Sequence, residues 1–387
     1  MITQIRQTRF NRSFPFPIRN VNAPMPLRSS RSLRASLGAV LAAALSLVAH
    51  ADQKTKTLDV YWIDSEGGGS TLIVTPANES VLIDSGNPGG RDSARIVAAA
   101  KAAGLSRIDY LLLTHFHIDH FGGAAEIAAE IPFEHIYERA IPAGDPDGRT
   151  PSTFPMTIKP YREIAAKRVH LVAGLSIPLQ TASGTPTLEL RCLGADQTFV
   201  TPTEAQQRTP NALDAGAPKP ADTSDNANSA VFLLSFGNFR FFDGGDLTWN
   251  LESKLVTPFN LPGIVDVYQT NHHGLEVSNN PVLVQSLAPT VVVMNNGPFK
   301  GGQPGAFAAI RSIESVNALY QLHESHNVPA GQNAPAEFIA NRNDFRGAAA
   351  AKCPANVIKL SVAADGKSYT MFVPSTGHVK SFGTRQQ

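Results

Sequence analysis

The chain has 387 residues, of which 42% are hydrophobic, and this is ample for a buried core in one large or two ordinary domains. No internal repeat is evident, which argues against a repeat architecture. Without residues 1–51, 26 Lys and Arg stand against 32 Asp and Glu, so the net charge is about −6. Because nucleic-acid affinity rests largely on Lys and Arg, the chain has no strong nucleic-acid footprint.

The N-terminal segment, residues 1–51, differs from the rest because it holds seven arginines and no acid. Its apolar run, Leu37 to Val48, has about the length of a secretory h-region, and Ala49-His50-Ala51 fits the small-x-small cleavage pattern. The sequence therefore predicts a signal peptide over 1–51, with a translation start at Met25, and a periplasmic or secreted protein. The run is too short to span a bilayer comfortably, so no membrane span is expected after cleavage. An uncleaved membrane anchor is the alternative.

The mature chain opens with elements of alternating or β-branched character. Three glycines at 67–69 follow the first of them, and no Lys-Ser/Thr follows the glycines. A turn in which backbone approaches backbone is therefore favoured over a phosphate-binding loop. The expected elements are strands at Leu58 to Ile63, Thr71 to Thr75 and Val81 to Ile83, and then a helix at Arg91 to Ala103.

The stretch IDYLLLTHFHIDHFGG, residues 108–123, carries a buried strand followed by four metal-capable side chains: His115, His117, Asp119 and His120. Alternate residues of an extended chain point the same way, so His115 and His117 can face one cation. Asp119 and His120 follow where the chain turns, and they can face a second cation nearby. Two glycines then lead into a helix, AAEIAAEI.

From 145 to 224 the pattern loosens, with many Pro, Gly and Thr, and we expect a loop-rich insertion that shapes the substrate site. His135 precedes this region and His170 lies within it, and both are interpreted as ordinary strand or loop histidines. Order returns in the second half of the chain. The expected elements there are strands at Ala230 to Phe236, Phe239 to Phe242, Val265 to Tyr268 and Thr290 to Met294, helices at Pro281 to Leu287 and Phe307 to Val316, and a hairpin of Val357 to Ala363 with Tyr369 to Val373.

Four motifs together resemble the metallo-β-lactamase-fold superfamily: VLIDSG at 81–86, H-x-H-x-D-H at 115–120, FFDGGD at 241–246 and NHHG at 271–274. The resemblance implies an α/β fold, an αββα sandwich of two mixed sheets, as a single domain over 52–387. The arrangement of DNANS at 225–229 before the GD strand and HHG is similar to the branch with ComEC-type competence proteins and phosphorylcholine esterases. Many superfamily members supply a further histidine to the first metal, and that motif is absent here.

The resemblance implies a role for each candidate residue. His115 and His117 would bind a first metal, Asp119 and His120 a second, and Asp246 would bridge both. Of the last histidine pair, His273 is assigned to the second metal and His272 to the substrate or its transition state, with the reverse order left open. Asp84 would accept a hydrogen bond from the ring N–H of a ligand histidine and so hold its tautomer. Further candidate substrate contacts are Asn226, Asn228 and His323.

Histidine nitrogens and carboxylate oxygens suit two divalent metal ions, zinc first, with Mn or Fe as alternatives. A hydroxide held by such a pair of cations can attack a phosphodiester or phosphate ester. The leading hypothesis is therefore an exported dinuclear metal-dependent hydrolase of a small-molecule or cell-envelope substrate. The alternatives are a β-lactam or lactone ring opener and a non-catalytic metal-binding module. Cys192 and Cys353 would meet an oxidising compartment after export, where they could pair.

Overall fold

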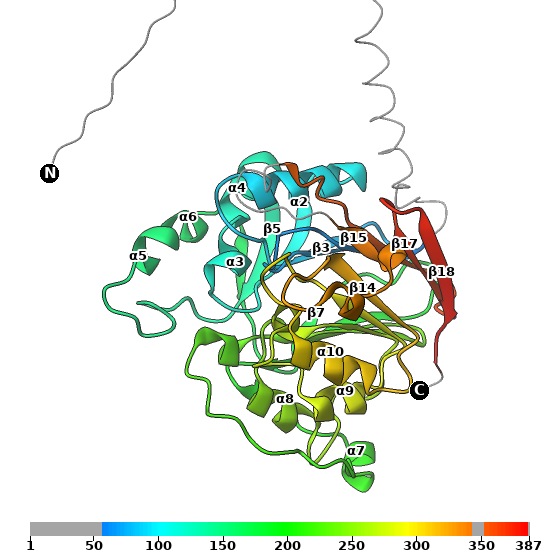
Figure 1. Ribbon diagram of the computed structural model, residues 1–387. Helices are drawn as coiled ribbons and strands as arrows, with labels where there is room; N and C mark the ends of the chain where they lie inside the picture. Colours follow the sequence, from blue (N-terminus) through cyan, green and yellow to red (C-terminus); the bar gives the residue numbers. More distant parts are fainter. Residues whose placement is uncertain (1–55, 343–351, 386–387) are drawn as a thin grey trace, which may run out of the picture. The chain divides into compact units, whose positions relative to one another are not determined.

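Two mixed β-sheets pack against each other and carry helices on their outer faces (Figure 1). The structure is a computed structural model that describes residues 56–342 and 352–385. These residues all belong to one compact unit. The predicted fold class, an α/β sandwich of the αββα type, is confirmed. The predicted signal peptide lies outside the described residues.

The first sheet has the strand order β18-β17-β16-β1-β2-β3-β4-β5-β6. Neighbours are antiparallel from β18 to β3 and parallel from β3 to β6. Its central strands are buried along their whole length and largely apolar, because both faces are covered. The strands are β1 (Leu58–Trp62), β2 (Thr71–Val74), β3 (Ser80–Ile83), β4 (Ile108–Leu112), β5 (Phe133–Glu138), β6 (Lys167–His170), β16 (Ile358–Val362), β17 (Ser368–Val373) and β18 (His378–Gly383).

The second sheet has the order β15-β14-β13-β12-β11-β10-β8-β7, and β9 pairs with β8. It is parallel from β15 to β11 and antiparallel from there to β7. The strands are β7 (Ser176–Ile177), β8 (Leu188–Ala195), β9 (Thr198–Phe199), β10 (Val231–Phe236), β11 (Phe239–Asp243), β12 (Val267–Gln269), β13 (Val291–Met294), β14 (Ala318–His323) and β15 (Ile339–Asn341).

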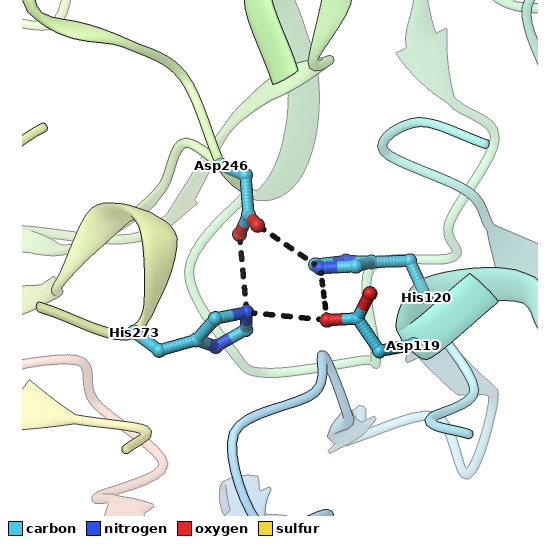
Figure 2. Close-up of side chains that lie close together, drawn as sticks. All are labelled: Asp119, His120, Asp246 and His273. Atoms are coloured by element: carbon cyan, nitrogen blue, oxygen red, sulfur yellow. Dashed lines mark ion pairs between the residues drawn. The ribbon is translucent and has the colours of Figure 1, made fainter. Parts of the chain in front are cut away.

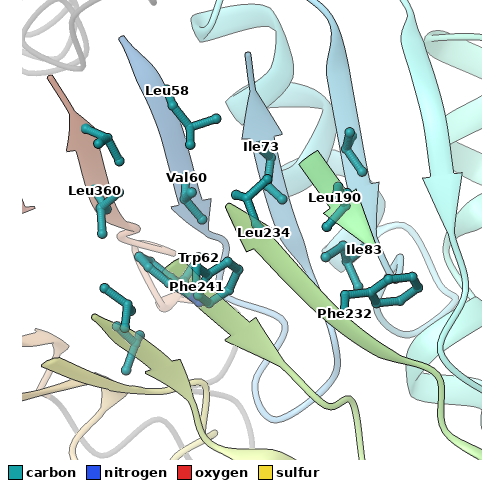
Figure 3. Close-up of a cluster of buried hydrophobic side chains, with 14 of the residues drawn as sticks. Leu58, Val60, Trp62, Ile73, Ile83, Leu190, Phe232, Leu234, Phe241 and Leu360 are labelled. Carbon is teal, nitrogen blue, oxygen red and sulfur yellow. The ribbon is translucent and has the colours of Figure 1, made fainter. Parts of the chain in front are cut away.

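The main hydrophobic core lies between the two sheets (Figure 3). Val60 and Trp62 of β1 meet Leu234 of β10 and Phe241 of β11 there, all of them almost completely buried. The Trp62 and Phe241 rings pack edge to face with centroids 5.6 Å apart. The Trp62 indole also donates a hydrogen bond to Gln269 Oε1 at 2.7 Å, so one polar bond joins β1 to β12 across this core.

Helices form the outer layers. Ile96, Val97 and Ile127, from α2 and α4, pack on the outer face of the first sheet, whereas α8, α9 and α10 pack on the second. Within the described residues, no helix is both long and apolar enough to cross a membrane. The helices are α2 (Arg91–Ala102), α3 (Ile118–Phe121), α4 (Ala124–Glu130), α5 (Phe154–Thr157), α6 (Lys159–Arg162), α7 (Glu204–Arg208), α8 (Trp249–Val256), α9 (Pro281–Leu287) and α10 (Pro304–Arg311), with 3-10 turns η1 (Asp225–Asn228), η2 (Asn271–Gly274), η3 (Ala330–Gln332) and η4 (Ala336–Phe338).

Two expectations need correction. The range 145–224 is less irregular than predicted, because it contains β8, which pairs with β10 inside the second sheet. Within the described residues, the segments 139–153 and 209–224 contain no helix or strand. The helix predicted at Phe307 to Val316 begins earlier and ends earlier, since Pro304 occupies its first turn, where proline is tolerated.

The two cysteines, whose pairing the sequence left open, do not form a disulfide. Both are free thiols. Cys192 is fully buried in β8, where its sulfur contacts Gly194 O at 3.2 Å, whereas the Cys353 sulfur contacts Asp64 Oδ2 at 3.3 Å. Burial raises the pKa of each thiol to about 12, so neither is a ready nucleophile.

Candidate metal centre

Four segments that follow parallel strands meet at one place between the sheets. Asp84 follows β3, and the histidine motif at 115–120 follows β4. Asp246 follows β11 of the second sheet, and His273 follows β12. Loops at the carboxyl ends of parallel strands are where α/β folds place ligand sites. Parallel pairing of β3 with β4 and of β11 with β12 therefore gathers these residues.

Asp119, His120, Asp246 and His273 face a common centre (Figure 2). Asp246 Oδ2 lies 3.3 Å from His120 Nε2, and Asp246 Oδ1 lies 3.3 Å from His273 Nε2. Asp119 Oδ2 completes the group at 3.4 Å from His120 Nε2 and 3.7 Å from His273 Nε2. Metal–nitrogen bonds of about 2.0–2.1 Å in a tetrahedron place ligand atoms roughly 3.3 Å apart, so the spacing fits one divalent cation.

The histidine nitrogens at this centre support that fit. In the part of the chain that the structure describes, His115 Nε2, His120 Nε2 and His273 Nε2 are buried and have no hydrogen-bond partner. A buried polar atom without a partner costs free energy, which a bound cation would recover. Burial alone would raise the pKa of Asp246, but the imidazoles of His273 and His120 hold it well below its ordinary value. An ionised carboxylate among free imidazole nitrogens is a good cation-binding set.

The residues assigned to the first metal lie beside this group. His115 Nε2 is 4.0 Å from Asp246 Oδ2, the same oxygen that faces His120. Asp246 therefore has the position that a bridging ligand requires. The His117 ring lies next to His115, with centroids 4.6 Å apart, but its Nε2 faces Asp147 at 2.9 Å. The structure thus gathers all six predicted ligands, while their individual roles stay predictions.

Asp84 and Gly69 fix the back of the site. Asp84 Oδ2 lies 2.7 Å from His120 Nδ1 and accepts a hydrogen bond from Thr114 Oγ1 at 2.7 Å. This contact is what the predicted role of Asp84 requires, since it leaves His120 Nε2 to face the centre. A Cβ atom on Gly69 would lie 2.7 Å from both Asp84 Oδ2 and His120 Nδ1, so the triple glycine marks a close approach of backbone to the site.

The last histidine pair sits on an unusual backbone. His272 and His273 both have positive φ, 51° and 55°, which is rare for residues other than glycine. The buried carboxylate of Glu252 in α8 holds this turn, because it accepts hydrogen bonds from Asn271 Nδ2 at 2.6 Å and from the Asn279 amide at 2.8 Å. His273 consequently points into the quartet, whereas His272 Nε2 lies 3.4 Å from Asp246 Oδ2 at the rim.

Three predicted substrate contacts do not join the centre. Asn228 is occupied by hydrogen bonds with Gln197 and Asp225. Asn226 is mostly buried and lines a separate pocket beside Trp249. His323 is fully buried, and its Nε2 lies 2.7 Å from Asp64 Oδ1.

Two side chains at the site were missed by sequence reasoning. Lys300, from the segment between β13 and α10, contacts Asp119 Oδ2. Asp147, from the irregular segment 139–153, contacts His117. Neither lies in a motif: Lys300 follows a Pro-Phe dipeptide, and Asp147 belongs to DPDG, which is typical of a turn. Only the folded chain brings them to the metal-capable residues.

An open pocket of about 320 Å³ adjoins the centre. His117 and Asp119 line one side of it, and residues of 145–154 line the other, including Arg149. A larger pocket of about 490 Å³ lies beside α8, but none of the candidate ligands lines it. The smaller pocket is therefore the better candidate for substrate.

Comparison with known proteins gives one family. Residues 64–176 match the Metallo-beta-lactamase superfamily. The match contains the 115–120 motif and ends before Asp246 and His273. Over 231 residues, 60% of the chain, the protein is 25% identical to Competence protein ComA of Neisseria gonorrhoeae, in agreement with the ComEC-type resemblance. The chain spans 26% of the length of that relative.

Solved structures resemble the chain more distantly. One is CmlA, a diiron beta-hydroxylase from Streptomyces venezuelae, with 14% identity, a TM-score of 0.35, and coverage of 68% of this chain and 48% of that one. Another is a diphosphatase from the PhnP family, with 11% identity, a TM-score of 0.35, and coverage of 73% and 93%. TM-scores this low carry no functional argument.

Proposed function

We propose, from the premise that residues 64–176 carry a metallo-beta-lactamase superfamily domain, that this protein is an exported dinuclear metal-dependent hydrolase of phosphodiesters or phosphate esters. The convergence of Asp119, His120, Asp246 and His273 from both sheets carries the proposal. Export rests on the composition of residues 1–51. The substrate class proposed is a small molecule or a cell-envelope component.

In this proposal, one set of residues at the site binds the metal ions, and His272 contacts the substrate. Asp119, His120, Asp246 and His273 would hold one cation, zinc first among the divalent metals. His115 and His117, with Asp246 shared, would hold the other. When bound, such a pair supplies Lewis acidity and lowers the pKa of a water molecule. His272, at the rim, can donate a hydrogen bond to a substrate oxygen as negative charge develops there.

Lys300 supports an anionic substrate. Its side chain is 42% exposed, and its ammonium group contacts Asp119, a predicted metal ligand. Once Asp119 binds a cation, the carboxylate's charge is shared with that cation, and the ammonium group's three N–H donors can turn to a phosphate oxygen. A neutral ester substrate would gain no charged contact from the Lys300 ammonium group.

Replacing Lys300 with methionine should raise KM for bis-p-nitrophenyl phosphate by about ten- to a hundredfold and change kcat much less. The estimate follows from about 1.5–3 kcal/mol for a hydrogen bond to a charged group. Steady-state kinetics on this phosphodiester measure the effect, with Lys300→Arg as the variant that keeps the charge. An unchanged KM in Lys300→Met would remove this support for an anionic substrate.

A small chromogenic panel tests the proposed function itself. Purified protein loaded with Zn²⁺ should hydrolyse bis-p-nitrophenyl phosphate or p-nitrophenyl phosphate, and chelation with EDTA should abolish turnover, because the nucleophile depends on metal. Chelator-sensitive turnover of nitrocefin alone would favour the β-lactam or lactone alternative. Two bound cations with no turnover on esters, amides and phosphates would favour a non-catalytic module.

A further inference from the structure

Asp147 makes a close contact with the first metal site that the ligand assignments leave unexplained. Its carboxylate approaches His117 Nε2 with both oxygens, at 2.9 Å and 3.1 Å. The Asp147 side chain is only 7% exposed, although it lies in the irregular segment 139–153. An almost buried carboxylate in a surface segment needs partners. Besides the His117 ring, Asp147 has the Arg149 guanidinium group at 2.5 Å and the Asp225 backbone amide at 2.8 Å.

The other two histidines of the motif show how the chain orients its rings. His115 Nδ1 lies 3.0 Å from Thr114 Oγ1, and His120 Nδ1 lies 2.7 Å from Asp84 Oδ2. In both, the held nitrogen is Nδ1, and Nε2 has no hydrogen-bond partner within the described residues. His117 shows the reverse arrangement, because its held nitrogen is Nε2. Its Nδ1 is therefore the nitrogen left for a cation.

We propose that Asp147 is a positioning residue for the first metal: it holds His117 as the Nε2–H tautomer, so that the Nδ1 lone pair faces the cation. A carboxylate behind a ligand histidine fixes the ring and makes it a stronger ligand. The inference rests on the proposed function, since it presumes that His117 binds metal. The first site lacks the third histidine that many superfamily members have, and the contact between Asp147 and His117 would stabilise the ligand geometry there.

The same carboxylate joins three segments around the site. Asp147 Oδ1 also accepts a hydrogen bond from the Asp225 amide at 2.8 Å, at the start of η1. Asp225 Oδ2 in turn accepts one from the Phe116 amide at 2.6 Å, between the two histidines of the first site, and Asp225 Oδ1 contacts Arg139. The segment 139–153, η1 and the metal-binding loop are therefore fixed together. Asp225, rather than Asn226 or Asn228, is the residue of DNANS that reaches this loop.

Metal titration distinguishes a positioning role of Asp147 from a role as a direct metal ligand. Apoprotein is titrated with Zn²⁺ against a chromogenic chelator, and wild type should bind two equivalents. Asp147→Ala should weaken one equivalent by about ten- to a hundredfold and leave the other unchanged, as expected for loss of an outer partner of a ligand. Asp147→Asn should recover much of this affinity, because its amide oxygen still accepts the Nε2–H bond. The melting temperature of each apoprotein checks that the variants fold.

Asp214→Ala removes an exposed carboxylate from the irregular segment 209–224 and should bind both equivalents as wild type does. Two wild-type affinities in Asp147→Ala would overturn the inference. An Asp147→Asn variant as weak as Asp147→Ala would also overturn it, because the carboxylate would then be a ligand itself. A wild-type chain that bound no metal would instead overturn the proposed function, and this inference with it.

Discussion

Asp246→Ala should lower kcat/KM on the phosphodiester by about a thousandfold or more and remove bound metal. Asp246 is 2% exposed, and its oxygens lie 3.3–4.0 Å from the Nε2 atoms of four histidines. Without this carboxylate, neither of the two proposed cations would keep its shared anionic ligand. A loss of roughly 4 kcal/mol in transition-state stabilisation corresponds to that factor. Kinetics and elemental analysis of metal per chain measure both effects.

Asp243→Asn is the matched control. Asp243 ends β11, three positions before Asp246, and it is equally buried. Its Oδ1 accepts a hydrogen bond from the Gly245 amide, and within the described residues it forms no ion pair with the quartet. Burial raises the pKa of Asp243 to about 7, so a neutral amide is a close substitute. This variant should keep its metal. If Asp246→Ala also kept full metal and activity, the bridging assignment would be refuted.

Asp64→Ala should reduce the free energy of unfolding by about 3–5 kcal/mol, because it breaks a buried ion pair. Asp64 is fully buried just past β1, where it accepts hydrogen bonds from His323 Nε2 at 2.7 Å and from Arg95 Nη1 at 3.0 Å. These partners come from β14 of the second sheet and from α2 over the first. Urea unfolding monitored by tryptophan fluorescence measures the loss.

The effect of Asp64 should depend on pH in a defined direction. Burial alone would raise its pKa, but His323 and Arg95 lower it from 3.8 to about 2. A depressed pKa means that this stabilisation is present above about pH 4 and is lost as the pH falls through 2. The gap between wild type and Asp64→Ala should therefore narrow as the pH falls below 4.

Glu163→Ala provides the comparison for Asp64. Glu163 forms an exposed pair with Lys159, with side chains 66% and 72% exposed, and its loss should cost less than about 0.5 kcal/mol. An equally small loss in Asp64→Ala would show that the buried cluster is not a stabilising clamp between the sheets.

Much of the fold follows from local sequence pattern. The buried strands β3, β4 and β13 are mostly apolar, so their position can be predicted without tertiary information. The motif at 115–120 also predicts its own place, because glycines and a strand end bound it. Parallel strands then bring Asp246 and His273 to it, as the resemblance implied.

Elements with a mixed pattern could not be predicted in the same way. In α8, Glu252 sits on the buried face and binds the turn at 271–280, so a charged residue interrupts the apolar stripe expected of a helix. In β18, every second residue is exposed and the strand lies at a sheet edge, so its signal is weak. Positive φ at His272 and His273 leaves no trace in sequence, since it is imposed by surrounding contacts.

The candidate ligands come from both sheets, and the chain segments that carry them are far apart in sequence. A cation can complete its coordination shell only when the two halves have docked, so a partly folded chain has no tight site to offer. By thermodynamic linkage, the free energy of ion capture then adds to that of docking. The protein should acquire its metal and its final rigidity in the same late step of assembly.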